Sequence, residues 1–403
     1  PRFFAYFPAN AAPASVLAEQ LAAAIGAQAM LWQTSPVATE MEIRMVDWLR
    51  QALGLPERFR GVIQDSASTA TFSAVLAMRE RALGGAGNAE GLAGGLRLRL
   101  YASEQGHSSV EKAARMAGIG SANLVGVPTG EGWGMRADAL AEAIRADRAA
   151  GHLPAGVILV VGGTGIGASD PVADCAAVAR AEGLPVHLDA AWAGAAMICP
   201  EERAAWAGAE ALDSIVVNPH KWLGAQFDCA VQFLAEPGEQ IRALAVRADY
   251  LATPGREEIT DFSDWVPPLG RRFRALKLWF VLRAHGLSGL RAMIRDHIDW
   301  ARGLAERVAA EPDFELVTPP MFSLFTFRHA PEGAADLDRL NARLVAAIND
   351  DGRIYVTQTR HEGRAVIRFQ VGGWETTEAD VALAWETIRE IACGLGPEEE
   401  DAG

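Results

Sequence analysis

The chain has 403 residues, half of them hydrophobic, so it can bury a substantial core and form two or three domains. Its 37 basic and 51 acidic residues give a formal net charge of −14, which argues against nucleic acid or an anionic membrane surface as a partner. No apolar stretch approaches the ~20 residues that a membrane span needs. No signal peptide opens the sequence, so we expect a cytoplasmic protein.

The sequence opens on a dense aromatic segment, Phe3 to Pro8, without a preceding methionine. Such a start is unusual for a folded protein, and we expect a further N-terminal segment before Pro1. The four cysteines are far apart and form no CxxC pair, which favours buried thiols over disulfides or a zinc site. We therefore predict no metal centre.

The middle of the chain alternates short aliphatic runs with helical patterns. The pattern predicts strands at 97–102, 123–127, 156–161, 185–189 and 214–217, and helices at 72–83, 108–117, 136–150 and 170–182. Asp170 and Pro171 are typical of the N-cap and first turn of a helix. Strands that alternate with helices indicate an α/β fold whose central sheet is mostly parallel.

After Gly286 the pattern changes to that of a smaller α+β domain. We expect helices at 287–310, 336–349 and 378–393, a strand at 322–327, and a hairpin of 353–357 with 364–369. The predicted organisation is an N-terminal segment with a substrate-pocket strand (1–50), a large cofactor-binding domain (51–286), a small C-terminal domain (287–395) and an acidic tail (396–403).

Lys221 follows the strand at 214–217, in the sequence Asn-Pro-His-Lys-Trp. A lysine there is either a solvated surface amine or a reactive one. Its neighbours Pro219 and Trp222 favour the second interpretation, because an apolar wall lowers the pKa of a lysine and suits it to Schiff-base chemistry.

Asp189 ends the preceding strand and is followed by Ala190 and Ala191. An acid at this position is either a helix cap or buried ion-pair partner, or the group that keeps a pyridine nitrogen protonated. Small flanking residues would let a flat cofactor approach. Because ligands gather at the carboxyl ends of parallel strands, Asp189 and Lys221 together predict a site for pyridoxal 5'-phosphate (PLP).

Two further positions fit such a site, although each has an ordinary alternative. Ala67 and Ser68 open a predicted helix, whose free N–H groups could bind a phosphate or simply be capped. His107 stands between a strand and a helix, where an imidazole is either a cap or a group stacked on a cofactor ring.

A competing interpretation comes from the glycine-rich segment after the strand at 156–161. Gly163, Gly165 and Ala168 fit the G-x-G-x-x-A pattern of nicotinamide-binding dehydrogenases, and Asp189 lies about twenty residues further on. However, the next helix is predicted to begin only at 170, and a dehydrogenase gives Lys221 no role.

Taken together, these residues resemble the PLP-dependent amino-acid decarboxylases of the aromatic-L-amino-acid decarboxylase type. The similarity runs from Phe3-Phe4-Ala5-Tyr6-Phe7-Pro8 to Ala384-Trp385-Glu386, and the run from Pro268 to Lys277 is especially characteristic. The resemblance implies the aspartate aminotransferase-like fold (fold type I), a homodimer, and decarboxylation of an aromatic amino acid such as DOPA, tyrosine, phenylalanine, tryptophan or 5-hydroxytryptophan.

The resemblance also implies a role for each matching residue. Lys221 is expected to form the Schiff base, Asp189 to pair with the pyridine nitrogen, and His107 to stack on the ring. The other expected cofactor contacts are Ala67, Ser68, Thr164, Ala191, Asn218 and His220. Tyr6, Phe7, Pro8, Ala9, His107 and Gly270 are expected at the substrate, and Tyr250 as the proton donor to its carbanion.

Some positions depart from the family pattern and leave the substrate ring open. Thr69 replaces a usual glutamate, Ala9 a common threonine, and Trp192 a common tyrosine, whereas Gly270 leaves room for an indole. The alternatives are a PLP-dependent aromatic aldehyde synthase or a decarboxylase of histidine or glutamate. Tyr250, which is phenylalanine in many aldehyde synthases, favours simple decarboxylation.

Overall fold

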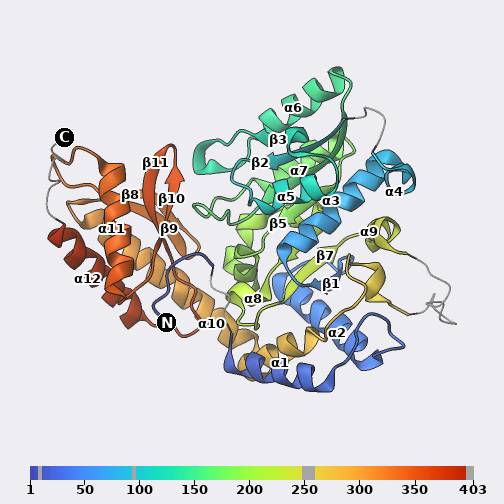
Figure 1. Ribbon diagram of the computed structural model, residues 1–403, viewed down its shortest axis with the longest axis horizontal. Helices are drawn as coiled ribbons and strands as arrows, with labels where there is room; N and C mark the ends of the chain where they lie inside the picture. Colours follow the sequence, from blue (N-terminus) through green and yellow to red (C-terminus); the bar gives the residue numbers. More distant parts are fainter. Residues whose placement is uncertain (8–10, 93–96, 247–258, 396–403) are drawn as a thin grey trace. The chain divides into compact units, whose positions relative to one another are not determined.

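The structure is a computed structural model that describes residues 1–7, 11–92, 97–246 and 259–395 (Figure 1). Its contacts divide the chain into two units. The large unit comprises Ala9–Gly163 and Ala168–Leu290, and the small unit comprises Pro1–Pro8, Thr164–Gly167 and Arg291–Gly403. The N-terminal aromatic segment therefore groups with the C-terminal part of the chain.

A seven-stranded sheet forms the centre of the large unit, in the order β1-β7-β6-β5-β4-β2-β3. Its strands are β1 (Arg60–Gln64), β2 (Leu98–Ser103), β3 (Leu124–Val127), β4 (Leu153–Val160), β5 (Val186–Asp189), β6 (Ser214–Val217) and β7 (Ala230–Leu234). All of them run in one direction except β7, which pairs antiparallel with both β6 and β1. This confirms the predicted mostly parallel sheet.

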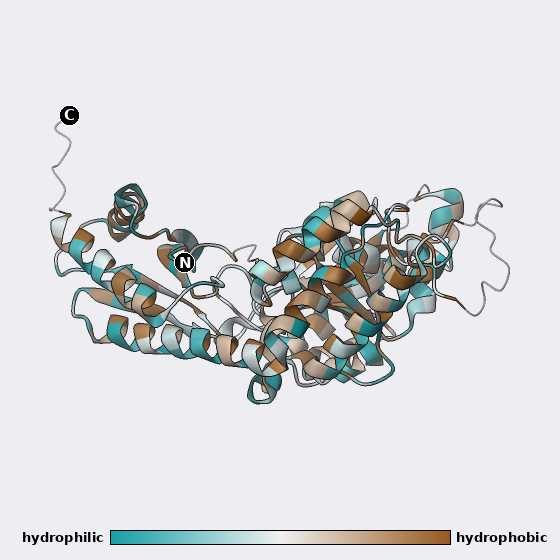
Figure 2. Ribbon diagram, turned by 90° about the horizontal axis from the view of Figure 1, so that it is seen from below, coloured by the Kyte–Doolittle hydropathy of each residue, from teal (hydrophilic) through white to brown (hydrophobic). Residues whose placement is uncertain are grey.

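Helices cover this sheet, and the hydrophobic pattern explains why. The α-helices of the large unit are α1 (Pro13–Ile25), α2 (Pro36–Leu53), α3 (Ala67–Leu83), α4 (Ala86–Glu90), α5 (Ser109–Met116), α6 (Ala137–Ala149), α7 (Val172–Ala181), α8 (Pro219–Trp222) and α9 (Pro237–Leu244). Of these, α2, α3, α6, α7 and α8 pack against its strands, whereas α4, α5 and α9 pack on α3. The long helix α3 crosses β1 and β4 to β7. Along the ribbons, hydrophobic and hydrophilic residues alternate, as expected for helices with one buried face (Figure 2).

Asp170 is not the N-cap that the sequence predicts, because α7 begins only at Val172. Its carboxylate instead accepts hydrogen bonds from the N–H groups of Met135 at 2.7 Å and Val160 at 2.8 Å. Burial raises the pKa of Asp170 to about 6, and these N–H groups oppose the shift. The residue therefore ties the end of β4 to the segment before α6.

The small unit is built on a four-stranded antiparallel sheet in the order β10-β11-β9-β8. Its elements are β8 (Phe314–Met321), β9 (Leu324–His329), β10 (Thr357–His361), β11 (Arg364–Gln370), α11 (Leu337–Asp351) and α12 (Glu378–Gly394). The helix α10 (Ala275–Ala310) enters it from the large unit. Phe4 stacks on Phe369 in its core, with ring centroids 4.4 Å apart.

Two predictions for this region were wrong in their boundaries. The helix expected from 287 is the second half of α10, because Gly286 has a φ of 63° and kinks a helix that had begun at Ala275. The first hairpin strand is at Thr357–His361, not 353–357. His361 pairs with Arg364 across the turn Glu362-Gly363, both at positive φ, and this tight turn fixes the register.

The edge strand β1 is closed by a buried ion pair instead of a further strand. Glu42, on α2, accepts the N–H of Ile63 at 2.8 Å, and Arg271 donates to the carbonyl of the same residue at 2.7 Å. Nη2 of Arg271 is 2.6 Å from Oε1 of Glu42, and both side chains are almost fully buried. The pair therefore satisfies the outward backbone groups of Ile63, just before the chain enters α3.

Breaking this pair should be costly, because one charge would remain buried without its partner. We expect Arg271→Met to lower the free energy of unfolding by about 3–5 kcal/mol. Denaturant unfolding measures this loss. The double variant Arg271→Met/Glu42→Leu should recover part of it, and a double variant that is no more stable than Arg271→Met would contradict the explanation.

Candidate active site

Five parallel strands bring the polar residues of interest to one edge of the large sheet. The register places Val160 beside Asp189 and Asp189 beside Val216, so the carboxyl ends of β4, β5 and β6 are level. β1 and β2 end at the same edge, because they run in the same direction. The residues that follow these strands form the candidate site.

Asp189 is the fixed negative charge of this edge. Its side chain is 6% exposed and accepts one hydrogen bond, from the N–H of Ala191 at 3.0 Å. No cation among the described residues forms an ion pair with it. A buried carboxylate is expensive unless it is paired, so this position suits a ligand that brings a proton or a positive charge.

Lys221 lies in the single turn α8, whose N-cap is Asn218. Its side chain is half-buried. The indole of Trp222 is buried and stacks on Trp192, with ring centroids 5.3 Å apart. The residue after the lysine therefore belongs to a buried aromatic pair, and its predicted role as an apolar wall for the lysine stays a prediction.

The hydrogen bonds of His220 determine how the Asn218 amide is oriented. The Nδ1 atom of His220 accepts the N–H of Cys229 at 2.9 Å, so the proton of the neutral ring is on Nε2. This Nε2 is 3.3 Å from the Asn218 amide, whose Oδ1 as placed has no partner. Turning the amide so that Oδ1 accepts from Nε2 leaves the NH2 group to donate to an anion.

The N-terminus of α3 provides a second group of donors. Ser66 caps the helix by accepting the N–H of Thr69 at 3.2 Å, while the first N–H groups, at Ala67 and Ser68, have no partner within the helix. Ala67 packs with Ala191 and Val216 in one buried cluster. The helix end therefore lies against the segments that follow β5 and precede Asn218, where it can bind a phosphate.

His107 shares the electrostatic environment of Asp189 and Lys221. Its Nδ1 accepts the N–H of Ser109 at 3.1 Å, which orients the ring at the start of α5. Desolvation lowers the pKa of His107, the Asp189 carboxylate opposes that shift, and the Lys221 ammonium adds to it. His107 therefore lies within electrostatic range of the two other residues, Asp189 and Lys221, that the sequence analysis placed at the catalytic centre.

Within the small unit, Tyr6, Phe7 and Thr164 surround a residue that the sequence analysis missed. Arg368 donates to the carbonyl of Thr164 at 3.0 Å and to that of Tyr6 at 2.9 Å, and its guanidinium lies over the Phe7 ring at 4.5 Å. Burial lowers the pKa of Arg368 to about 10. An arginine inside an otherwise apolar strand pattern was the available signal.

Arg368 also lines a hollow of about 370 Å³ in this unit, together with Tyr6, Thr164, Tyr355 and Thr357. Its Nη2 has no hydrogen-bond partner among the described residues. The hollow thus combines aromatic rings with a buried guanidinium.

The remaining predicted residues are less informative. Gly270 lines a separate hollow of about 310 Å³, formed with α1 residues such as Glu19 and Ala22. Pro8, Ala9 and Tyr250 lie outside the described residues. Their predicted roles stay predictions.

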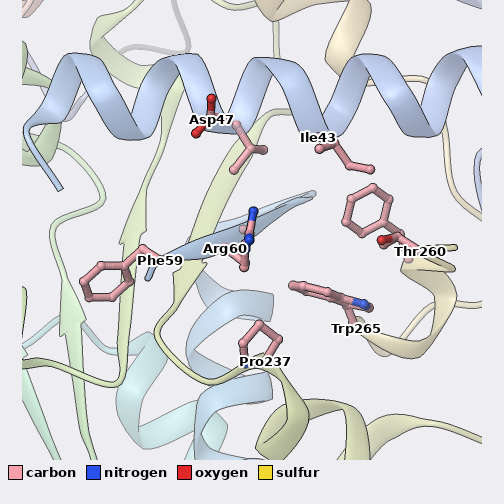
Figure 3. A pocket seen from close by; sticks show the side chains of 10 residues that line it. Ile43, Asp47, Phe59, Arg60, Pro237, Thr260 and Trp265 are labelled. Atoms are coloured by element: carbon pink, nitrogen blue, oxygen red, sulfur yellow. The ribbon is translucent and has the colours of Figure 1, made fainter. Parts of the chain in front are cut away.

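Another hollow, of about 280 Å³, lies between α2, β1 and the segment around Trp265 (Figure 3). It contains Arg60 and Asp47, but Asp47 already accepts hydrogen bonds from Arg50 and Gln51. None of the predicted cofactor or substrate residues lines it. We therefore place the chemistry at the sheet edge.

Neither a metal site nor a membrane-spanning helix is found among the described residues. They contain no group of three histidine, cysteine or acidic side chains that could hold a metal ion. Within the same residues, no helix is both long and apolar enough to cross a membrane.

The glycine-rich segment does not have the geometry of a dinucleotide-binding turn. The N–H groups of Gly162 and Gly163 both bind the carbonyl of Ala168, which closes a loop, and α7 begins only at Val172. No helix N-terminus follows the glycines directly, and the dehydrogenase interpretation loses its structural basis.

A lysine, an acid without a cationic partner among the described residues, and a helix N-terminus at one sheet edge are the groups that a PLP-dependent enzyme needs. The sequence matches the pyridoxal-dependent decarboxylase conserved domain over residues 1–330. The chain belongs to this decarboxylase family, which confirms the predicted class of enzyme, its cofactor and its fold.

Individual relatives agree with this assignment. The chain is 37% identical to phenylacetaldehyde synthase of Arabidopsis thaliana (98% of this chain, 82% of the relative). It is 38% identical to aromatic-L-amino-acid decarboxylase of Rattus norvegicus (98% and 84%). The crystal structure of Oryza sativa TDC with PLP and tryptamine superposes with a TM-score of 0.94 at 37% identity, over 98% of this chain and 84% of that one.

The neutral state of His220 should be visible in the pH dependence of stability. Burial lowers its pKa to about 4, and the Lys221 ammonium adds to the shift. Because an unfolded histidine titrates near pH 6.5, roughly one proton is taken up on unfolding between about pH 4 and 6.5. The stability from the neutral ring is therefore complete above pH 6.5 and lost as the pH falls toward 4.

We expect His220→Asn to reduce the slope of unfolding free energy against pH near pH 5, by about 1.4 kcal/mol per pH unit. Urea unfolding of the apoenzyme at several pH values measures this slope. An unaltered slope, with the same denaturant dependence, would show that the ring is not held neutral.

Proposed function

We propose that this chain removes the carboxylate of an aromatic L-amino acid as CO2 and releases the corresponding amine. The proposal is carried by one observation: Lys221, the N-terminus of α3 and Asp189, whose carboxylate has no cationic partner among the described residues, lie at one sheet edge. The aromatic class of substrate is supported by the decarboxylases and the synthase that the chain resembles.

PLP, when bound, supplies a conjugated ring that accepts the electron pair left by the departing carboxylate. The residues present fit this group. Lys221 would hold it covalently, Asp189 would keep the proton on its ring nitrogen, and His107 would cover the ring face. Ala67, Ser68 and the reoriented amide of Asn218 would bind the phosphate.

The protein's remaining tasks are to orient the substrate and to move one proton. The bond to the carboxylate must stand roughly perpendicular to the cofactor plane, which is a positioning requirement on the pocket. Tyr6 and Phe7, fixed by Arg368 within the small unit, are our candidates for the aromatic wall. Tyr250 is our candidate for the donor that returns a proton to the substrate carbon.

The functional assignment can be tested on the purified protein. We expect the wild type to show an absorbance band near the visible edge, and borohydride reduction to add the cofactor's mass to the Lys221 peptide. Lys221→Ala should lose both signals because it lacks the amine. A reduced cofactor on another lysine would contradict the assignment.

The substrate is identified by product analysis with aromatic amino acids, histidine and glutamate. We expect amine and CO2 from at least one aromatic amino acid, and no comparable turnover of histidine or glutamate. Preference for a non-aromatic substrate would establish the alternative decarboxylase.

A second candidate function is aromatic aldehyde synthesis, which the similarity to a phenylacetaldehyde synthase favours. If Tyr250 is the proton donor, Tyr250→Phe should reduce amine release by roughly 10²-fold or more and raise aldehyde and hydrogen peroxide. The assay quantifies all three products under air. An unchanged amine yield would exclude this role, whereas aldehyde from the wild type would favour the synthase.

We also propose a homodimer. Leu17, Leu21 and Ile25 recur every four residues along α1 and are 57%, 47% and 62% exposed in the single chain. An apolar stripe of this kind is typical of a surface covered by another protein. A cytoplasmic location is our further expectation.

A further inference from the structure

His187 lies beneath the candidate site, and the proposed chemistry gives it no role. It is on β5, two residues before Asp189, so both side chains leave the same face of the strand. The ring is fully buried, and burial lowers the pKa of His187 to about 4. A neutral imidazole offers one donor and one acceptor, which suits it to joining two hydroxyl groups.

Each ring nitrogen of His187 contacts a hydroxyl on a different element. Nε2 is 3.2 Å from Oγ1 of Thr71, and Nδ1 is 2.9 Å from Oγ of Ser214. Thr71 lies one helical turn after Ala67, at the start of α3. Ser214 opens β6, the strand that leads to Asn218 and Lys221.

Other polar contacts near this position connect different elements. Gln232, on β7, donates to Ser214 at 3.1 Å and to the carbonyl of Ala70 at 3.3 Å. It therefore links β7 with β6 and α3, but not with β5. Among the described residues, no other side-chain hydrogen bond joins β5 to α3.

This position matters because the two ends of the cofactor would be held by these two elements. Asp189 on β5 would hold the ring nitrogen, and the N-terminus of α3 would hold the phosphate. A rigid ligand gains from both contacts only if their separation matches its own length.

We propose that His187 is a positioning residue that fixes α3 against β5, so that the ring-nitrogen acid and the phosphate-binding helix end are held at the separation PLP requires. This inference rests on the proposed function. It concerns the spacing of two contacts, neither of which His187 makes itself.

The test compares the affinity of the apoenzyme for PLP with its affinity for pyridoxal, which lacks the phosphate. His187→Asn keeps an amide near the position of Nδ1 but cannot reach Thr71, whereas His187→Gln places one near Nε2. Thr71→Val removes the hydroxyl at nearly constant volume. Val75→Ala, a fully buried apolar position on the same helix, is the matched control for lost stability.

We expect His187→Asn and Thr71→Val to weaken PLP binding by about tenfold while pyridoxal binding changes by less than about threefold. The ratio of the two affinities should therefore fall in both variants. His187→Gln should restore most of the ratio, and Val75→Ala should leave it unchanged. Equilibrium titration of the cofactor absorbance or of protein fluorescence measures each affinity.

The possible failures are distinguishable. If the wild type binds no PLP, the proposed function fails and this inference with it. If the wild type prefers PLP strongly and His187→Asn and Thr71→Val keep that preference, only the role of His187 is overturned. The role of His187 is also overturned if Val75→Ala lowers the ratio of PLP affinity to pyridoxal affinity as much as His187→Asn and Thr71→Val do. The lower ratio would then result from lost stability. If the histidine variants do not fold, the affinity ratio of Thr71→Val alone tests the proposal.

Discussion

The large unit is organised around a buried carboxylate that has no cationic partner among the described residues. Asp189 is placed at the sheet edge by β5 and is 6% exposed, with one backbone N–H as its hydrogen-bond donor. A buried carboxylate of this kind needs a compensating group, and we propose that a protonated ring nitrogen of the cofactor is that group. The phosphate of the same ligand requires hydrogen-bond donors, and the N-terminus of α3 and the amide of Asn218 are the donors that we propose for it. The site thus offers one negative contact and one group of N–H donors at the two ends of a flat molecule.

Much of this arrangement follows from the sequence, because a parallel sheet covered on both faces requires unbroken apolar strands. The unbroken aliphatic run at 156–161 predicts such a strand, and parallel pairing with the predicted strands at 185–189 and 214–217 places the residues after all of them at one edge. The sequence does not reveal which group a buried polar side chain binds. Asp170 has the ordinary features of a helix cap, yet it binds the N–H groups of Met135 and Val160. His187 and Thr71 are 116 positions apart, so their contact depends on the folded sheet.

The two buried arginines show how differently a guanidinium can be accommodated. Arg271 is paired with Glu42 and stabilises an edge strand. Arg368, in the small unit, donates to the carbonyls of Thr164 and Tyr6, and its Nη2 has no hydrogen-bond partner among the described residues. A carbonyl pair positions a guanidinium without neutralising it, so Arg368 holds the segments that carry two predicted site residues while retaining its charge. The sequence pattern that predicts β11 as a strand says nothing of this distinction.

Overall sequence identity does not distinguish the two proposed reactions, decarboxylation and aldehyde synthesis. The chain is 37% identical to a phenylacetaldehyde synthase and 38% identical to a decarboxylase, over nearly its whole length in both comparisons. Both reactions use the same electron-accepting ring, so the residues that hold the ring cannot decide the outcome. The decision must come from groups that reach the substrate carbon after the carboxylate has left, since a proton delivered there forms the amine before oxygen can react. In this chain the group proposed for that position is Tyr250, whereas His107, whose ring is oriented by the N–H of Ser109, is proposed to cover the cofactor ring.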